Sequence, residues 1–304
     1  MDTILETAHL AKRYKNFQAL NDLNIHVEKG AIYGLIGKNG AGKTTLIRII
    51  SGLQKPTDGS YTLYGESSSK GNPAKMRRQM GAIIETSSIY GDMNARDNLL
   101  VQYKLVGTPS AESIDELLKL VGLENTGKKK AKNFSLGMKQ RLGIAIALAG
   151  KPDFLILDEP INGLDPQGII EIRELILKLN REQGITILIS SHYLDELSKI
   201  ATHYGFLESG SIIKEISNAE LMKQLEYKIQ MKVSDKRAFA DYFDQNGIAY
   251  ETVNDETFNV FGEHNLSKFV HRLFQADLVA DEIHEQEESL ESYYMNLIGG
   301  SAND

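Results

Sequence analysis

The feature that most constrains this chain is a glycine-rich segment that lies between an apolar run and an amphipathic pattern. The segment reads Gly37-Lys38-Asn39-Gly40-Ala41-Gly42-Lys43-Thr44, which fits the pattern G-x-x-x-x-G-K-[ST] in full. Residues 31–36 before it have the composition of a short buried strand, and residues 43–51 after it place apolar side chains on one helical face. A strand, a glycine loop and a helix in this order predict a loop whose backbone N–H groups surround phosphate oxygens.

We expect this loop and the first turn of the helix to hold the phosphates of a nucleotide. The residues predicted to bind it are Gly37, Asn39, Gly40, Ala41, Gly42, Lys43, Thr44 and Thr45. Lys43 is expected to reach the β- and γ-phosphates and to take part in catalysis, and Thr44 to hold Mg²⁺. The alternative, a glycine turn that matches by chance, is disfavoured because a strand and a helix flank the segment in the required order.

Two carboxylates follow a second apolar run, at residues 154–157. Functional groups in open parallel sheets gather at the carboxyl ends of the strands, which is where Asp158 and Glu159 stand. Asp158 is expected to hold Mg²⁺, partly through water, and Glu159 to polarise an attacking water as general base. The alternative, two solvated acids at a strand end, would be favoured if the phosphate loop were absent.

Apolar runs alternate with helical patterns as far as residue 216. Further strands are expected at residues 80–84 and 186–189, with a helix over 167–183, and this order predicts a mainly parallel sheet covered on both faces. The alternation at Ile25 and Val27 predicts an antiparallel edge. The predicted fold class is therefore α/β with a phosphate loop.

The pattern changes after residue 216, so we expect two domains, residues 1–216 and 217–304. Strands are expected over 227–233, 248–253, 257–261 and 278–283, and helices over 236–245 and 266–274. This order of strands and helices predicts a small α+β ferredoxin-like extension, followed by a final helix from residue 289.

Charge and composition exclude several classes of protein. The chain of 304 residues has 34 basic and 41 acidic residues, and this net charge of −7 argues against a dedicated nucleic-acid binder. The chain has no cysteine, which excludes a disulfide framework, a cysteine-ligated zinc site and thiol catalysis. The acidic surplus belongs to the second domain, which has 7 basic and 17 acidic residues, whereas the first has 27 and 24. No apolar run approaches the roughly 18 residues of a membrane span, so we expect any membrane role to depend on a partner.

Several further motifs resemble those of the ATPases of ABC transporters. Phe134-Ser135-Leu136-Gly137-Met138-Lys139-Gln140-Arg141 resembles the signature motif L-S-G-G-Q-x-Q-R of that family. Asn162-Gly163-Leu164-Asp165 resembles its D-loop, Ser190-Ser191-His192 its switch region, and Tyr14 the aromatic residue that stacks on adenine. The motifs cover residues 1–216 in the family's order, and they imply an ABC-type nucleotide-binding domain with a helical signature subdomain at about residues 86–150.

In that family two ATPase subunits dimerise head to tail, and each ATP lies between one subunit's phosphate loop and the other's signature motif. The resemblance implies that Ser135 and Gly137 contact the γ-phosphate held by a second copy, and that His192 contacts the γ-phosphate of its own site. A helix expected over residues 139–149 would direct its N-terminus at this anion. Tyr14 could instead be an ordinary surface aromatic, and that alternative stays open.

One departure from the family's pattern falls in the nucleotide site. The family's Q-loop glutamine should follow the strand at residues 80–84, and Glu85 is found there. A glutamine amide can donate a hydrogen bond to phosphate or water, whereas an ionised carboxylate cannot and repels the γ-phosphate. We hypothesise that Glu85 couples the site to a membrane partner and faces a basic residue there; a neutral substitution is the alternative.

Residues 83–86, 95–99 and 135–141 resemble one branch of the family, the ATPases of bacitracin-, lantibiotic- and other antimicrobial-peptide exporters. The resemblance implies an ATP-hydrolysing subunit that powers export of an antimicrobial or amphipathic peptide, or of a lipophilic drug. The implied cofactors are ATP and Mg²⁺. The implied partners are a separate polytopic membrane permease and a second copy of the chain, with no nucleic acid. The implied location is the cytoplasmic face of the cell membrane, through the permease.

Two other functions compete with export. A soluble ABC-type ATPase without a permease, acting in translation or chromosome maintenance, is one alternative, but translation-type relatives usually have two cassettes and chromosome-type relatives insert a long coiled coil. An ATP-sensing regulator that does not turn over is the other, and it would most simply lack the general base that Glu159 supplies.

Overall fold

A computed structural model describes the chain at residues 2–86, 88–107, 112–225, 227–263, 265–287 and 289–300. The chain divides into two compact units, Met1–Asn218 and Ala219–Asp304, and each is described by itself. The change of sequence pattern predicts a boundary after residue 216, two residues before the one in the structure. Among the described residues, no helix is both long and apolar enough to cross a membrane.

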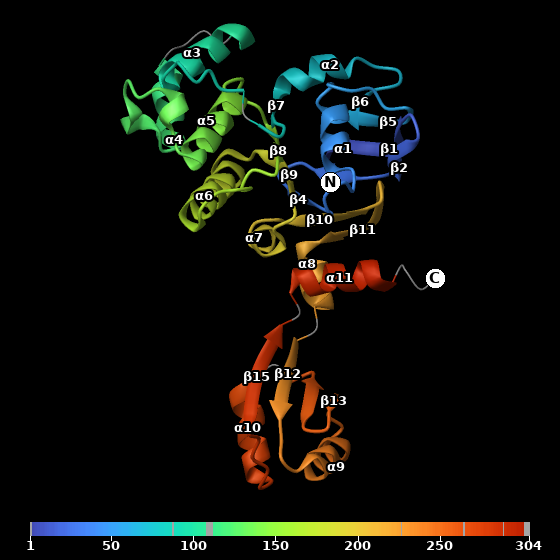
Figure 1. Cartoon of the computed structure of the whole chain (residues 1–304). Coiled ribbons are helices and arrows are strands. Elements are labelled where there is room, and N and C mark those ends of the chain that lie inside the picture. The colour runs from blue at the N-terminus through green and yellow to red at the C-terminus, as the bar shows by residue number, and fades with distance from the viewer. Residues whose placement is uncertain are drawn as a thin grey trace. The chain divides into compact units, whose positions relative to one another are not determined.

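The first unit consists of two sheets with helices between and around them (Figure 1). Its strands are β1 (Thr3–Tyr14), β2 (Phe17–Leu23), β3 (His26–Glu28), β4 (Ile32–Ile36), β5 (Asp58–Leu63), β6 (Glu66–Ser67), β7 (Met80–Ile83), β8 (Phe154–Asp158), β9 (Thr186–Ser191), β10 (His203–Glu208) and β11 (Ser211–Ser217). Its helices are α1 (Lys43–Ile50), α2 (Pro73–Met76), α3 (Ala95–Val106), α4 (Glu112–Leu120), α5 (Leu136–Leu148), α6 (Pro166–Gln183) and α7 (Leu194–Ser198). Short 3₁₀ helices lie at Arg77–Gln79, Glu124–Thr126 and Ala131–Asn133.

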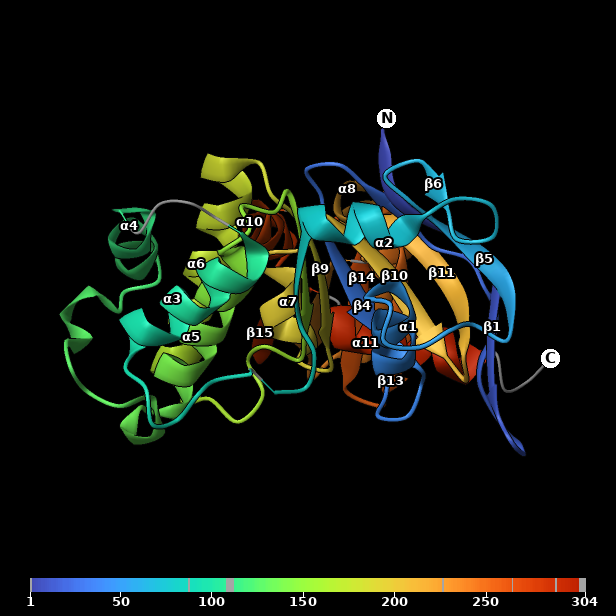
Figure 2. The same cartoon turned by 90° about the horizontal axis from the view of Figure 1, so that it is seen from above.

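Six strands form the sheet that carries the phosphate loop, in the order β11-β10-β4-β9-β8-β7. All neighbours run parallel except β10 and β11, which are antiparallel. Every residue of β4, β8 and β9 is buried, which explains why their sequences are nearly continuous apolar runs. Figure 2 shows α3, α5 and α6 on one side of this sheet, and α1 with the antiparallel sheet on the other.

The antiparallel sheet has the order β2-β1-β5-β6, and β3 pairs with β1. The sequence predicts an antiparallel edge here, and the structure makes it a separate sheet. One core cluster joins it to α1 and to the parallel sheet; its members include Leu5, Leu63, Leu46, Ile50 and Ile156. Because α1 is buried between the two sheets, the phosphate loop that precedes it is anchored from both sides.

The helices α3, α4 and α5 lie between β7 and β8 in the chain, inside the range predicted for a helical signature subdomain. The Asn94 side chain caps α3 by accepting a hydrogen bond from the backbone of Asp97, and Gly107 ends the helix in a left-handed conformation. The helix of the signature motif begins at Leu136, so its predicted start at residue 139 is wrong. The difference arises because Ser135 caps the helix, its Oγ accepting a hydrogen bond from the backbone of Met138.

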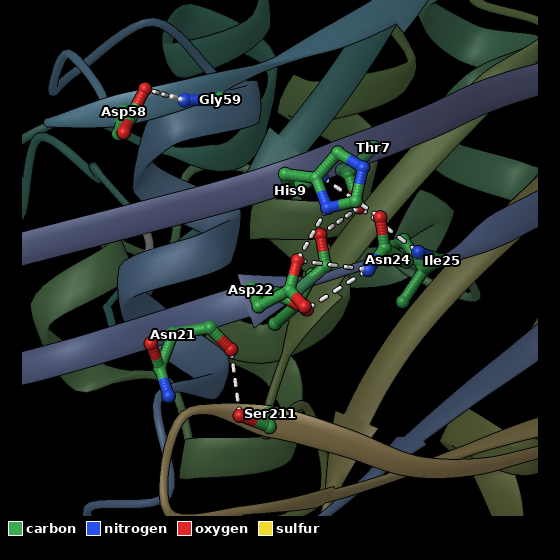
Figure 3. Close-up of polar contacts among 10 residues, drawn as sticks. Thr7, His9, Asn21, Asp22, Asn24, Ile25, Asp58, Gly59 and Ser211 are labelled. Carbon is green, nitrogen blue, oxygen red and sulfur yellow. Dashed lines mark hydrogen bonds and ion pairs between the residues drawn. The ribbon is translucent and has the colours of Figure 1, made fainter.

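A group of polar contacts holds two irregular positions of the antiparallel sheet, His9 (φ 51°) and Asp22 (φ 49°). They lie where the register of β1 shifts against β5 and β2. Figure 3 shows the two side chains facing each other: His9 Nδ1 lies 2.6 Å from Asp22 Oδ1, and the backbone N–H of His9 donates to Asn24 at 2.8 Å. The hydrogen bond with His9 lowers the pKa of Asp22 below its ordinary value. Ser211 donates to the carbonyl of Asn21 at 2.6 Å, which ties β2 to β11 of the other sheet.

The second unit has its own sheet and core. Its elements are α8 (Asn218–Gln224, which begins at the last residue of the first unit), β12 (Tyr227–Lys232), α9 (Lys236–Asn246), β13 (Tyr250–Asn254), β14 (Thr257–Phe261), α10 (Leu266–Gln275), β15 (Glu282–Glu287) and α11 (Leu290–Gly300). The strands form an antiparallel sheet in the order β13-β14-β12-β15. Phe243 is fully buried and packs against the rings of Phe239, Tyr250, Phe258 and Phe269.

The predicted last strand at residues 278–283 is wrong in position, because β15 begins at Glu282. Leu278 and Ala280 pack on the core of the unit without pairing in the sheet, so their apolar pattern indicates burial and not a strand. The exposed Glu282, His284 and Glu285 occupy an edge strand, where charged side chains oppose pairing with another chain. The alternation of apolar residues therefore does not predict this strand.

Gly59 and Gly65 allow a matched test of the contact between β5 and the bulge of β1. Both have left-handed backbone (φ 72° and 80°), but a Cβ at Gly59 would lie 2.1 Å from the carbonyl oxygen of His9, whereas a Cβ at Gly65 meets nothing within 4 Å. Gly65→Ala should lower the free energy of unfolding by about 1–2 kcal/mol, the cost of left-handed backbone. Gly59→Ala should lower it by about 1–3 kcal/mol more, because backbone atoms must move apart. Urea unfolding followed by circular dichroism measures both, and equal losses would contradict the close approach.

Candidate nucleotide-binding site

The phosphate loop runs from the end of β4 to the start of α1, as its sequence predicts. Gly42 stands at the N-cap of α1 with φ 116°, and no side chain caps the helix there. Gly42 therefore supplies no side-chain acceptor to the N–H groups of the first turn, and the helix dipole favours an anion at this end of α1.

Two glycines of the loop are required by close packing. A Cβ at Gly37 would lie 2.6 Å from the carbonyl oxygen of Leu207, and a Cβ at Gly42 would lie 2.7 Å from the carbonyl oxygen of Ala19. By contrast, Gly40 has φ 85° and nothing within 4 Å of a Cβ, so its requirement is conformational and its outer side is open. The loop thus rests against β2 and β10 at Gly42 and Gly37, and it has open space beside Gly40.

Lys43 is buried, with 6% of its surface exposed, and its ammonium lies within the loop. It donates hydrogen bonds to the carbonyl oxygens of Gly37 at 2.5 Å and Lys38 at 3.3 Å, and lies 3.3 Å from Glu159 Oε1. A buried ammonium is stable only where such acceptors surround it, so this cation is held at the position where phosphate oxygens would bind.

Asp158 and Thr44 meet at the same edge of the sheet. The Thr44 hydroxyl donates to Asp158 Oδ2 at 2.9 Å, and the Ser190 hydroxyl donates to Asp158 Oδ1 at 2.6 Å. Asp158 is 2% exposed, so its carboxylate is fixed by these two donors. A hydroxyl and a carboxylate next to a phosphate loop form the oxygen donor set that Mg²⁺ prefers, and these residues fit that ion.

Glu159 lies between a cation and a histidine. Its Oε1 faces Lys43, and its Oε2 lies 2.7 Å from His192 Nδ1. The residue has left-handed backbone, with φ 49°, which is uncommon for a residue that is not glycine and is typical of functional positions. The structure therefore brings together Lys43, Thr44, Asp158, Glu159 and His192, five of the residues that the sequence nominates.

A cavity of about 250 Å³ lies beside the loop. It is lined by Phe17, Ala19, Lys38, Asn39, Gly40, Gly42, Lys43, Thr44, Thr45, Glu159 and Asn162. The lining includes most of the predicted phosphate-binding residues, and it adds an aromatic ring, Phe17, which sequence reasoning did not nominate.

Tyr14 does not line this cavity. Its hydroxyl donates to Gln54, and the Lys12 ammonium lies 5.2 Å from the centre of its ring. Phe17 is its partner across the β1–β2 hairpin and is more exposed, at 59% against 39%. An aromatic residue three positions after Tyr14, before the apolar pair Ala19-Leu20, is the signal that could have identified it.

A second cavity, of about 720 Å³, shares Thr44, Glu159 and Asn162 with the first. Its lining also includes Glu85, Leu136, Lys139 and Gln140, so it extends from the phosphate loop to the signature helix. Ser135 and Gly137 line neither cavity. The structure therefore does not bring these two residues to the phosphate loop of their own chain.

Glu85 has a basic partner within the chain. Its Oε1 lies 2.5 Å from an amino group of Arg48, which extends from α1, and both side chains are partly exposed. Glu85 also has left-handed backbone (φ 61°) just after β7. Arg48 is therefore an alternative to the basic residue that we hypothesise in a membrane partner, because it already offsets the charge of this carboxylate.

Comparisons with known proteins agree with this geometry. Residues 20–162 match the ABC transporter family. The bacitracin transport ATP-binding protein BcrA of Bacillus licheniformis is 41% identical over 305 residues, which cover 99% of both chains. The lantibiotic transport ATP-binding protein SrtF of Streptococcus pyogenes is 45% identical over 224 residues, 73% of this chain and 95% of that protein. These relatives confirm the branch that the motifs indicate.

A similar solved structure supports ATP hydrolysis at this site. The ATP-binding cassette MJ0796, as a dimer in a post-hydrolysis state bound to ADP and Pi, superposes with a TM-score of 0.64 at 25% identity, covering 70% of this chain and 98% of that one. The likeness to BcrA also extends over both units of the chain. The chain belongs to the ATP-binding proteins of ABC transporters and is an ATPase.

Proposed function

We propose that this chain is the ATP-hydrolysing subunit of an exporter that moves an antimicrobial or other amphipathic peptide through a separate membrane permease. The observation that carries the proposal is the cluster of Lys43, Glu159 and His192 beside the Thr44–Asp158 pair, in a chain similar over its whole length to a bacitracin transport protein. The presence of Glu159 in contact with Lys43 disfavours a regulator that does not turn over. The whole-length relative disfavours a soluble ATPase without a permease.

The first cavity would receive ATP. The open backbone at Gly40 and the N-terminus of α1 would bind the β- and γ-phosphates, with Lys43 turning from its carbonyl acceptors toward them. Thr44, and Asp158 through water, would hold Mg²⁺, which when bound supplies positive charge beside the phosphates. Phe17 would lie against the adenine ring, in place of or together with Tyr14.

Hydrolysis would use water as the nucleophile. Glu159 would accept a proton as the water oxygen bonds to the γ-phosphorus and the bond to the β-phosphate oxygen breaks, which leaves ADP and phosphate. His192 contacts Glu159 and would also contact the γ-phosphate, so it would lie between that phosphate and the carboxylate. Most of the catalysis would be positioning and charge stabilisation, because the protein forms no covalent bond to the phosphoryl group.

A second copy of the chain would complete each site. Ser135 and Gly137 line neither cavity of their own chain, and a Cβ on Gly137 would make only ordinary contacts, at 3.9 Å. Within the described part of the chain, no close contact therefore requires glycine at this position, and the approach of a phosphate from another copy would supply the reason. Two copies would close on two ATP molecules and switch the permease, which would hold them at the cytoplasmic face of the membrane.

The first prediction concerns the general base. Glu159→Gln should keep ATP binding but lower the rate of hydrolysis about 100-fold or more, because the amide cannot accept the proton of water. Phosphate release and equilibrium binding of ATP measure the two effects. Glu182→Gln removes the same charge from an exposed position of α6 and should change neither quantity. Full turnover by Glu159→Gln would refute the assigned role.

The second prediction separates the two aromatic residues. Phe17→Ala should weaken ATP binding about tenfold, as expected for the loss of one stacked base, and leave binding of inorganic tripolyphosphate unchanged. Tyr14→Ala is the matched variant and should have the smaller effect. Competition against a fluorescent nucleotide measures both ligands. If Tyr14→Ala loses more ATP affinity than Phe17→Ala, Tyr14 is the residue that contacts adenine, as the motif indicates.

The third prediction concerns the coupling role of Glu85. In complex with the permease, Glu85→Gln should reduce both cargo-stimulated ATP hydrolysis and peptide transport, because the ion pair with Arg48 is lost. Arg48→Gln breaks the same pair from the other side and should act in the same direction. Unchanged hydrolysis and transport in Glu85→Gln would contradict any role in coupling.

A further inference from the structure

The hydroxyl of Ser190 lies at the centre of the contacts that fix the two acidic residues. Ser190 is the neighbour of Asp158 in the register of β8 and β9, and it is fully buried. Its Oγ donates to Asp158 Oδ1 at 2.6 Å and accepts the backbone N–H of Glu159 at 3.0 Å. One hydroxyl thus contacts both the metal-binding carboxylate and the backbone of the general base.

We propose that Ser190 is a positioning residue that sets the affinity of the site for Mg²⁺ through Asp158 and the placement of the Glu159 carboxylate. This inference rests on the proposed function, because it assigns Ser190 to the same magnesium and nucleotide site. It adds a residue for which the switch-region resemblance gives no role.

The contact to Asp158 fixes the plane of its carboxylate. Oδ2 accepts from Thr44 and Oδ1 from Ser190, so donors on two different elements hold the two oxygens. Without the Ser190 hydroxyl, Oδ1 would be a buried charged acceptor with no donor at this side, and the carboxylate would turn to find another. Groups that orient metal ligands in this way typically alter metal affinity 10- to 100-fold when they are removed.

The contact to Glu159 holds an unfavourable backbone conformation. The N–H of Glu159 is shared between the Oγ of Ser190 at 3.0 Å and its carbonyl oxygen at 3.2 Å. This pair of acceptors fixes the left-handed turn at φ 49°, which directs the Glu159 side chain toward Lys43 and His192. Loss of the hydroxyl would leave one acceptor and loosen the turn.

Neighbouring hydroxyls of the same strand do not make these contacts. The Oγ of Ser191 accepts the backbone N–H of Tyr193 at 2.9 Å, which belongs to the turn before α7. At the other end of β9, Thr186 is 2% exposed and its Oγ1 accepts the N–H of Gly30 at 2.9 Å. Thr186 is therefore a control, since its hydroxyl is also buried and hydrogen-bonded but lies at the opposite end of the strand from the site.

The test measures metal affinity apart from activity. The full-length chain is saturated with a non-hydrolysable ATP analogue, and the Mn²⁺ concentration that half-fills the site is measured by electron paramagnetic resonance, with analogue binding in EDTA measured alongside. Ser190→Ala should raise this Mn²⁺ concentration about 10- to 100-fold. Binding in EDTA should stay within about twofold, because Lys43 and the loop backbone hold the phosphates.

Two further variants separate positioning from general stability. Ser190→Thr retains the hydroxyl and should keep Mn²⁺ affinity near that of the wild type, even where the added methyl lowers the unfolding temperature. Thr186→Val should lower the unfolding temperature without changing Mn²⁺ affinity. If Ser190→Ala does not fold, Ser190→Cys, a weaker donor of similar size, takes its place and should weaken Mn²⁺ binding.

The outcomes distinguish this inference from the proposed function. Wild-type Mn²⁺ affinity in Ser190→Ala, or in Ser190→Cys, would overturn the positioning role and leave the proposed function intact. An equal loss in Thr186→Val and Ser190→Ala would overturn it as well, because the effect would then follow stability. Failure of the wild type to bind the analogue with or without metal would instead remove the proposed function.

Discussion

The register of three parallel strands sets the positions of the phosphate loop, the acidic pair and Ser190 in the nucleotide site. The pairing of β4 with β9 places Ile36 beside Ser191, and the pairing of β9 with β8 places Ser190 beside Asp158. Because parallel strands end at the same edge of the sheet, the phosphate loop after β4 and the two acids after β8 meet there. A slip of one residue would turn Asp158 to the other face of the sheet and break its contacts with Thr44 and Ser190.

Charge organises the site that this register creates. Lys43 is a buried cation whose neighbours are carbonyl oxygens and the Glu159 carboxylate, and Glu159 in turn meets His192. ATP brings further negative charge, so its phosphates compete with Glu159 for the ammonium and would release that carboxylate toward water. Arg48 offsets the one acid, Glu85, that the chain places where the family has a neutral glutamine. The negative charge of the acids thus offsets the positive charge of Lys43, and each acid contacts a basic or hydroxyl side chain.

The sequence predicts the parallel sheet and the acidic pair because both leave continuous patterns, an apolar run followed by a functional group. It does not predict contacts that depend on turns. Phe17 reaches the first cavity because the β1–β2 hairpin turns directly before it, and no periodicity distinguishes it from Tyr14. The Arg48–Glu85 pair joins two segments far apart in the chain, and β15 is polar at a sheet edge. In each case the deciding interaction is tertiary, so the periodicity of apolar residues does not predict it.

We propose that two copies of this chain enclose ATP between the phosphate loop of one and the signature motif of the other. The chain has no cysteine, so single cysteines can report this contact without interference. Chains with Asn39→Cys and chains with Leu136→Cys, both carrying Glu159→Gln, are mixed and oxidised with or without Mg-ATP. If ATP lies between these two segments, a disulfide-linked species of twice 33.9 kDa should form in the mixture and should require Mg-ATP. Absence of this species, or its formation equally without nucleotide, would show that the two copies do not enclose ATP in this way.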